Sequence, residues 1–476
     1  MNDFFEHDDD NSLSDLLERF DAMLSEDKHY FFDVEEYEDL IDHYLMNNEL
    51  GKCTTAVQLA IEQYPGHSGL LIRQAQLLVS SNKAEKALRV LTRVENMDPT
   101  NSEIYITKGA IYSQLKRYDE AIREYNKAIS EDEDLGNIYS NIAFEYENLG
   151  NYDKAIEYLK KVLEIEPDNE TIIFELAFCY EITNKADASI EYFTAFIDKN
   201  PYSKFAWFNL GVAYNSIELY EKAIEAFEFA IAIDPAFSSA YFNKANSLAG
   251  MQMYRQAVEA YRETFEHEDP EALTYYYIGE CFEKLEKPDE AITHFKKAID
   301  MDENIADAWI GMGVCYEEKG NMKAALRYIR RGLEIDPENP EYLATLAVCQ
   351  QHAGYFTEAA QTFTKSAQID PLDQEIWLDF SALFFEMSEY EHAIEILVTG
   401  KKHQPDNTSL DFRMVAYLYD LGRIKEAKAL LTDTVMKVQN PKGLKELIEF
   451  APHLLNDSYI ADLVVQVTRV DDLLNS

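Results

Sequence analysis

The sequence is poor in positive charge for its length of 476 residues. It contains 43 Lys and Arg against 88 Asp and Glu, so its formal net charge at pH 7 is −45. Phosphate backbones and anionic lipid surfaces repel a chain with this charge. The composition therefore predicts that nucleic acid is not a partner.

Long apolar runs and paired cysteines are also missing. No stretch approaches the ~18 apolar residues of a membrane span, and the first residues, MNDFFEHDDD, are acidic where a secretory signal begins with basic residues. The five cysteines include no CxxC pair, which fits a reducing compartment and neither a zinc ribbon nor a disulfide scaffold. We expect no membrane insertion and a cytoplasmic location.

Motifs for catalysis and for cofactors are absent as well. The sequence has no HxxxH or HExxH pattern, no phosphate-binding loop, no GxSxG and no dinucleotide fingerprint. The acidic run at residues 8–12 fails as a calcium loop because Leu13 stands where the loop needs glycine and Arg19 where it needs glutamate. We therefore predict no enzyme activity, no catalytic residue, no metal and no cofactor.

The sequence does contain a strict period of 34 residues. A small residue recurs at this spacing from Cys53 through Ala223 to Ala427, twelve times in all. A second small residue stands twelve positions earlier in ten units. Twelve positions later, eight of the units carry a proline: Pro65, Pro99, Pro167, Pro201, Pro235, Pro337, Pro371 and Pro405. Such self-similarity is typical of stacked repeat architectures.

Each unit has the hydrophobic pattern of two helices. In residues 204–237, the first half places Trp207, Leu210, Gly211 and Tyr214 at i, i+3, i+4 and i+7. The second half repeats this spacing from Tyr220 through Ala223 to Phe227. Because proline lacks the N–H that a helix interior needs, it ends the second helix. Each unit is thus predicted to be a helix, a tight turn and a second helix.

These small, aromatic and proline positions resemble the tetratricopeptide repeat in most units. The resemblance implies an all-α fold, a right-handed α-solenoid of helix-turn-helix repeats with terminal capping helices. We predict an acidic N-terminal segment with a capping helix at 1–33, twelve tandem 34-residue repeats at 34–441, and C-terminal capping helices at 442–476. Departures from the pattern are Ile41 and Val415 at the earlier small position, and Glu133, Asp269, Glu303 and Gln439 in place of proline.

The two ends of the chain carry their own helical patterns. From Ser12, a capping box and the stripe Leu13, Leu16, Leu17, Phe20 and Leu24 predict an amphipathic helix. That helix either caps the first repeat, as solenoid ends require, or docks elsewhere, with Phe4 and Phe5 as an internal competitor in the groove. At the other end we expect helices at Leu444–Phe450 and Tyr459–Leu474.

The resemblance also implies a binding surface, because first helices line the concave face of tetratricopeptide arrays, where extended or helical peptides lie. The residues that this places on the face are Phe144, Glu147, Phe174, Phe178, Glu181, Phe205, Phe208, Asn215, Phe242, Asn246, Tyr276 and Glu283. Aromatic anchors and carboxylates suit a peptide or protein that is basic and has apolar anchors. The alternative is that these rings pack between adjacent first helices.

The family's carboxylate clamp, which holds the C-terminus of a chaperone, needs basic residues on the same face. Ser140, Phe174, Phe208 and Phe242 stand there instead, so we predict no such clamp. The leading hypothesis is a non-catalytic scaffold or adaptor for a protein partner. A structural or self-assembling subunit of a larger complex is the alternative, and an RNA-binding repeat protein is a remote one. Four cysteines at one repeat position, Cys179, Cys281, Cys315 and Cys349, are predicted to be core residues.

Overall fold

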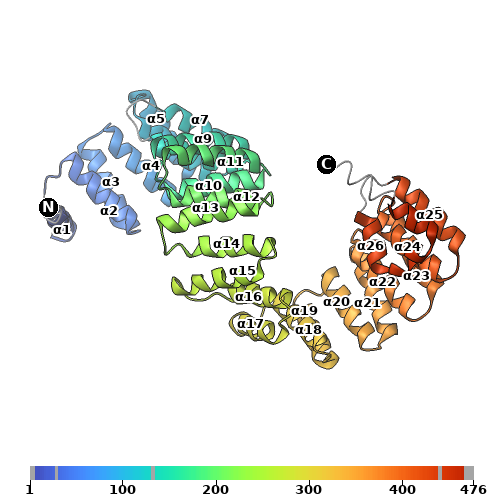
Figure 1. Cartoon of the computed structure of the whole chain (residues 1–476). Coiled ribbons are helices and arrows are strands. Elements are labelled where there is room, and N and C mark those ends of the chain that lie inside the picture. The colour runs from blue at the N-terminus through green and yellow to red at the C-terminus, as the bar shows by residue number, and fades with distance from the viewer. Residues whose placement is uncertain (1–5, 27–29, 130–134, 438–441, 466–476) are drawn as a thin grey trace. The chain divides into compact units, whose positions relative to one another are not determined.

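The structure is a computed structural model that describes residues 6–26, 30–129, 135–437 and 442–465. The regular elements of these residues are helices. It has twenty-six numbered α-helices and two short 3-10 helices, and the described residues contain no β-strand. The chain forms two compact units, Met1–Pro235 and Ala236–Ser476. Within each unit, consecutive helices lie side by side along the chain (Figure 1).

The first unit holds a leading helix and six helix pairs. In chain order they are α1 (Glu6–Glu26), α2 (Val34–Met46), α3 (Leu50–Gln63), α4 (Ser68–Ser80), α5 (Ala84–Met97), α6 (Ser102–Gln114), α7 (Tyr118–Ala128), α8 (Leu135–Asn148), α9 (Tyr152–Ile165), α10 (Glu170–Ile182), α11 (Ala186–Lys199), α12 (Lys204–Asn215) and α13 (Tyr220–Ile233).

The second unit holds six further pairs and the C-terminal helices. They are α14 (Ser238–Gly250), α15 (Tyr254–Glu263) with η1 (Thr264–Glu266), α16 (Ala272–Lys284), α17 (Pro288–Met301), α18 (Ala306–Glu318), α19 (Met322–Ile335), α20 (Pro340–His352), α21 (Phe356–Ile369), α22 (Gln374–Glu386), α23 (Tyr390–His403), α24 (Thr408–Asp420), α25 (Ile424–Lys437), α26 (Lys442–Phe450) and η2 (Pro452–Asn456). Residues 458–465 are also helical.

The turn inside every pair has the same unusual backbone. One residue per pair, at a spacing of 34, has φ between 52° and 80°. These residues are Asn48, Asn82, Lys116, Gly150, Asn184, Glu218, Gln252, Glu286, Gly320, Gly354, Ser388 and Gly422. The next N–H bonds the carbonyl five residues back, as from Leu219 to Tyr214 at 3.0 Å, which ends the first helix in the manner of a Schellman motif.

The small positions allow the two helices of a pair to approach closely. A Cβ added to Gly211 would lie 2.5 Å from a ring carbon of Phe227, and one added to Gly279 would lie 2.7 Å from the ring of Phe295. Ala223 is completely buried. The recurring small residues are therefore needed because an aromatic ring of the partner helix fills the space beside them.

Polar residues at the end of six units start the next helix. Six side chains accept hydrogen bonds from backbone N–H groups of the following first turn: those of Asn101, Asn169, Ser203, Asn339, Asp373 and Asn407. Each lies two residues after the proline of its unit, so proline ends one helix and the cap begins the next.

Two of the four units without the predicted proline have a shortened second helix. α7 has 11 residues and α15 has 10, where the other second helices have 14. α15 continues as the 3-10 helix η1, whose Thr264 is buried. The unit with Glu303 keeps a helix of full length, α17. Loss of proline therefore does not by itself decide where the second helix ends.

The leading helix α1 covers apolar side chains of the first pair. Leu16 and Phe20 are buried, and the Phe20 ring lies 5.8 Å from that of Phe32 and 5.9 Å from that of Tyr44. Arg19 forms an ion pair with Glu36 of α2 at 2.7 Å. The helix begins at Glu6, six residues before the predicted start. Phe4 and Phe5, the proposed internal competitor, lie outside the described residues.

The C-terminal end packs in a similar way. Leu444 and Leu447 of α26 are buried in one cluster with Phe412 and Val415 of α24. Residues 466–474 of the predicted last helix lie outside the described part of the chain.

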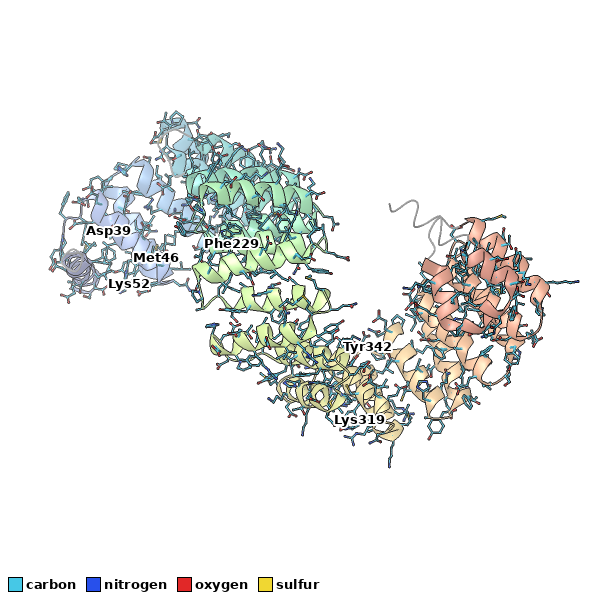
Figure 2. All side chains as sticks on the ribbon, viewed as in Figure 1. Asp39, Met46, Lys52, Phe229, Lys319 and Tyr342 are labelled. Carbon is cyan, nitrogen blue, oxygen red and sulfur yellow. The ribbon has the colours of Figure 1, made fainter. Side chains whose placement is uncertain are left out.

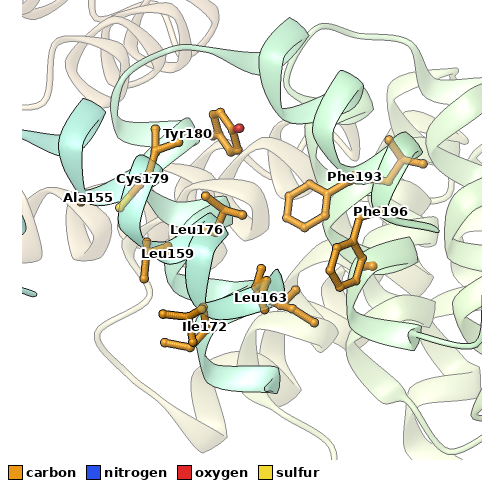
Figure 3. Close-up of a cluster of buried hydrophobic side chains, with 14 of the residues drawn as sticks. Ala155, Leu159, Leu163, Ile172, Leu176, Cys179, Tyr180, Phe193 and Phe196 are labelled. Carbon is orange, nitrogen blue, oxygen red and sulfur yellow. The ribbon is translucent and has the colours of Figure 1, made fainter. Parts of the chain in front are cut away.

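Adjacent pairs share apolar cores. Leu159 and Leu163 of α9, Leu176 of α10, and Phe193 and Phe196 of α11 belong to one such cluster (Figure 3). Cys179 belongs to the same cluster, and all five cysteines are buried and free. The prediction that the repeated cysteines are core residues is confirmed by this burial.

Candidate functional site

A groove of about 720 Å³ lies between α10, the start of α11, and α12 in the first unit. Its apolar lining comes from Phe174, Ala177, Phe178, Phe208, Val212 and Ile217. Glu181, Asn184, Lys185 and Asn209 supply polar groups. We call this the α10–α12 groove. Four of the residues predicted for the binding face, Phe174, Phe178, Glu181 and Phe208, line it together.

Two phenylalanines of α10 are exposed at this groove. Phe174 is 39% exposed and Phe178 is 51% exposed, and both sit on the helix face predicted from the repeat. The Phe178 ring contacts Tyr152 edge to face at 6.5 Å between centroids. Large exposed apolar side chains beside a concavity are typical of a binding surface, because a partner that buries them lowers the free energy.

The rings of α12 are less exposed. Phe208 is only 8% exposed and packs between Phe174, at 6.0 Å, and Phe227 of α13, at 5.7 Å. Phe205 is half-buried and meets Phe174 edge to face at 5.2 Å. Phe208 and Phe205 thus pack between adjacent first helices. This is the alternative that the sequence left open. Phe208 forms the wall of the groove.

Carboxylates lie close to these rings. Glu147 of α8 is half-buried and accepts a hydrogen bond from the Cys179 thiol at 3.4 Å. Burial raises the pKa of the Glu147 carboxyl above its ordinary value, and burial together with the charge of Glu147 raises the pKa of Glu175. Glu181 is exposed at the groove. Lys185 also lines the groove, but its ammonium pairs with Asp153.

The other predicted residues of the first unit lie outside this groove. Phe144 of α8 is 56% exposed, the most exposed ring of the predicted set. Asn215, at the end of α12, is half-buried. Neither residue is among those that line the α10–α12 groove.

In the second unit the predicted aromatic residues are half-buried in ring clusters. Phe242 lies 5.5 Å from Tyr261 and 5.6 Å from Tyr277, and Tyr276 lies 5.9 Å from Phe295. Asn246 accepts a hydrogen bond from the Tyr261 hydroxyl at 2.6 Å. These rings mainly hold successive helices together.

A smaller cleft of about 340 Å³ opens beside this ring cluster, lined by Asn246, Tyr277, Glu280 and Lys284. Burial, followed by the charge of Glu283, raises the pKa of the Glu280 carboxyl. The Glu283 carboxylate accepts a hydrogen bond from the Lys284 ammonium at 3.3 Å. Of the predicted residues in this unit, Asn246 lines this cleft.

The cysteine thiols of the second unit are buried. Burial raises the pKa of Cys281, Cys315 and Cys349 to about 12, so these thiols stay protonated at neutral pH. The described residues contain no group of three or more His, Cys, Asp or Glu arranged to hold a metal ion. Across the same residues, no helix combines the length and the apolar character that a membrane crossing requires.

Sequence reasoning missed two parts of the groove. Asn184 and Ile217 line it from the turns that follow α10 and α12, whereas the prediction considered helix faces alone. The signal was available for Asn184, because Asn and Gly recur at this turn position with the period of 34.

Comparison with known proteins agrees with these helix pairs. Three family models, each described as a tetratricopeptide repeat, match the chain: one at residues 78–140 and 284–349, one at 136–169 and 205–237, and one at 239–304. None of the curated proteins matches the sequence.

Among solved structures, the crystal structure of the APC/C hetero-tetramer Cut9–Hcn1 is similar with 14% identity and a TM-score of 0.44, covering 81% of this chain and 97% of that one. YrrB, described as a TPR protein with an unusual peptide-binding site, is similar with 22% identity and a TM-score of 0.33, covering 39% of this chain and 96% of that one. From the family models and its own repeated helix pairs, the chain belongs to the tetratricopeptide repeat family.

Proposed function

We propose that the protein is a non-catalytic interaction scaffold that holds a peptide or protein segment in the α10–α12 groove. The observation that carries the proposal is the pair of exposed rings, Phe174 and Phe178, beside a concavity of about 720 Å³. The family models support a role in protein interaction. The buried thiols stay protonated, so they are poor nucleophiles.

The chemistry of the groove suits a partner with apolar anchors and basic groups. Apolar side chains can pack on Phe174 and Phe178, because aromatic surfaces in a pocket dominate binding energy. Glu181 and the nearby Glu147 then favour Lys or Arg, since carboxylates steer cations during encounter. The net charge of −45 acts in the same direction at low ionic strength.

The test compares two phenylalanines of similar exposure. Phe178→Ala removes a ring of the groove, and Phe229→Ala removes one from α13. Phe229, labelled in Figure 2, is 53% exposed. Its ring stacks on that of Trp207 at 4.3 Å between centroids. Proteins captured from the native host are identified and quantified with the wild type and with each variant. We expect Phe178→Ala to lower capture of a direct partner roughly 30-fold or more, and Phe229→Ala to leave it unchanged.

Unchanged capture by Phe178→Ala, with both variants folded by circular dichroism, would contradict binding in this groove. If capture fell only for Phe229→Ala, the protein would still be a scaffold, with its partner on another surface. If either variant lost self-association, the result would instead favour the alternative function, in which the protein is a structural subunit of a larger assembly.

A further inference from the structure

A second groove, which lies in the second unit, is lined by a cluster of basic residues. Residues 319–333 contain five basic residues and no acidic one, in a chain with 88 acidic and 43 basic residues. Within this segment, Lys323, Arg327 and Arg330 occupy positions i, i+4 and i+7 of α19. That spacing places the three cations on one face of the helix.

This face lines a groove of about 1210 Å³ between α19 and the segment from the end of α20 to α21. Lys323, Arg327 and Arg330 form one side, and His352 and Tyr355 come from the other. We call it the α19–α21 basic groove. Figure 2 labels Lys319, just before α19, and Tyr342 on α20, which locate the two helix pairs that form it. Tyr355 is 51% exposed, which offers an aromatic surface beside the cations.

Three nearby carboxylates are paired with groups other than these cations. Glu334 pairs with Arg331, Asp289 with Lys319, and Glu317 with His352. Among the described residues, no carboxylate forms an ion pair with Lys323, Arg327 or Arg330.

The contacts that these cations do make are weak. The Arg327 guanidinium lies 4.9 Å from the Tyr328 ring centroid and donates to the Tyr328 hydroxyl at 3.5 Å. Glu334 and Glu358 also line the groove, so its lining holds three Lys and Arg residues against two carboxylates, an excess of one positive charge.

We propose that the α19–α21 basic groove binds an acidic segment of a protein partner. Lys323, Arg327 and Arg330 would pair with its Asp or Glu side chains, and guanidinium groups match carboxylates in two-bonded geometry. Tyr355 would pack against an apolar residue of the same segment. This proposal does not rest on the α10–α12 groove.

The overall acidity of the chain favours a short acidic segment over nucleic acid. At physiological ionic strength, exposed charges more than about 8 Å apart are largely screened, so local cations decide the interaction at contact. A short peptide can remain within the reach of three adjacent cations. The continuous phosphate backbone of a nucleic acid extends beyond them and meets the acidic remainder of the surface.

The experiment uses a fluorescein-labelled synthetic peptide of alternating Asp and Glu with two leucines, measured by anisotropy with the full-length protein. The test variant is Lys323→Glu with Arg327→Glu and Arg330→Glu. A matched control is Lys86→Glu with Arg89→Glu and Arg93→Glu, the same three residue types, exposed on α5. Both variants change the net charge equally. We expect about tenfold or greater weakening for the α19 variant and less than about twofold for the control.

Other outcomes would overturn the proposal. One is no binding of the peptide to the wild type up to about 1 mM, and another is equal weakening by both variants. Tighter binding of a labelled oligouridylate than of the peptide would assign the groove to nucleic acid instead. If the α19 variant fails to fold, Lys323→Gln with Arg327→Gln and Arg330→Gln removes the cations without adding negative charge, and the same weakening is expected.

Discussion

Helices α10 and α12 carry phenylalanine at the same position of successive repeats, yet the two rings differ in exposure. Phe174 is 39% exposed, whereas Phe208, which lies 34 residues later, is 8% exposed. The rings touch each other, but Phe208 also packs on Phe227 of its own pair. Repeat position thus sets the direction of a side chain, and its neighbours set whether a partner can reach it.

The largest expected effect is on protein stability, and it differs between substitutions of these two rings. Phe208→Ala leaves a cavity between α10, α12 and α13, and should lower the free energy of unfolding by about 3–5 kcal/mol. Phe174→Ala removes a partly exposed ring and should lower it by about 1–2 kcal/mol. Urea denaturation followed by circular dichroism measures both values. Equal losses would show that the two positions are equivalent after all.

A second comparison concerns the turn position shared by Glu286 and Gly320, where φ is 57° and 73°. Gly320→Ala should destabilise by about 1 kcal/mol, because a side chain in this backbone region is strained. Apart from Gly320 and its two neighbours in the chain, no residue has an atom within 4 Å of the added Cβ, so the cost comes from conformation alone. Glu286→Gly should stabilise by about 0.5–1 kcal/mol for the converse reason. Thermal melting measures the change in melting temperature of each variant. If both variants changed it in the same direction, the turn would not be strained in the same way at the two positions.

The smallest effect distinguishes Glu147 from Glu181, which are also 34 residues apart. Burial raises the pKa of Glu147 above 4.5, so its ionisation disfavours the folded state. The protein is therefore more stable while Glu147 is protonated, and it loses this stability as the pH rises through the pKa of Glu147 in the folded state. Glu147→Gln should raise the melting temperature slightly at neutral pH and leave it unchanged well below 4.5. The exposed Glu181→Gln is the control, and an equal shift in both variants would argue against burial as the cause.

The period of 34 was sufficient to predict the helix pairs, because small residues and prolines leave a direct mark on the sequence. Gly211 could be predicted to sit at a close helix contact, and Phe227 to fill the space beside it. The burial of Phe208 could not be predicted, since it depends on two rings from other helices that repeat position alone does not place. The sequence also suggested Phe242 and Tyr276 as members of the binding face, where the structure shows half-buried rings packed against tyrosines and phenylalanines.

The short helix α15, followed by η1, has a consequence for how the second unit opens. Stability in stacked repeats depends largely on the contacts of each pair with its immediate neighbours, so such arrays can lose structure in sections. α15 has fewer helical hydrogen bonds than the 14-residue second helices around it. Backbone amides at residues 254–266 should therefore exchange their hydrogens earlier than those of α17. One turn of 3-10 helix in place of α-helix would then decide where this part of the second unit first admits water.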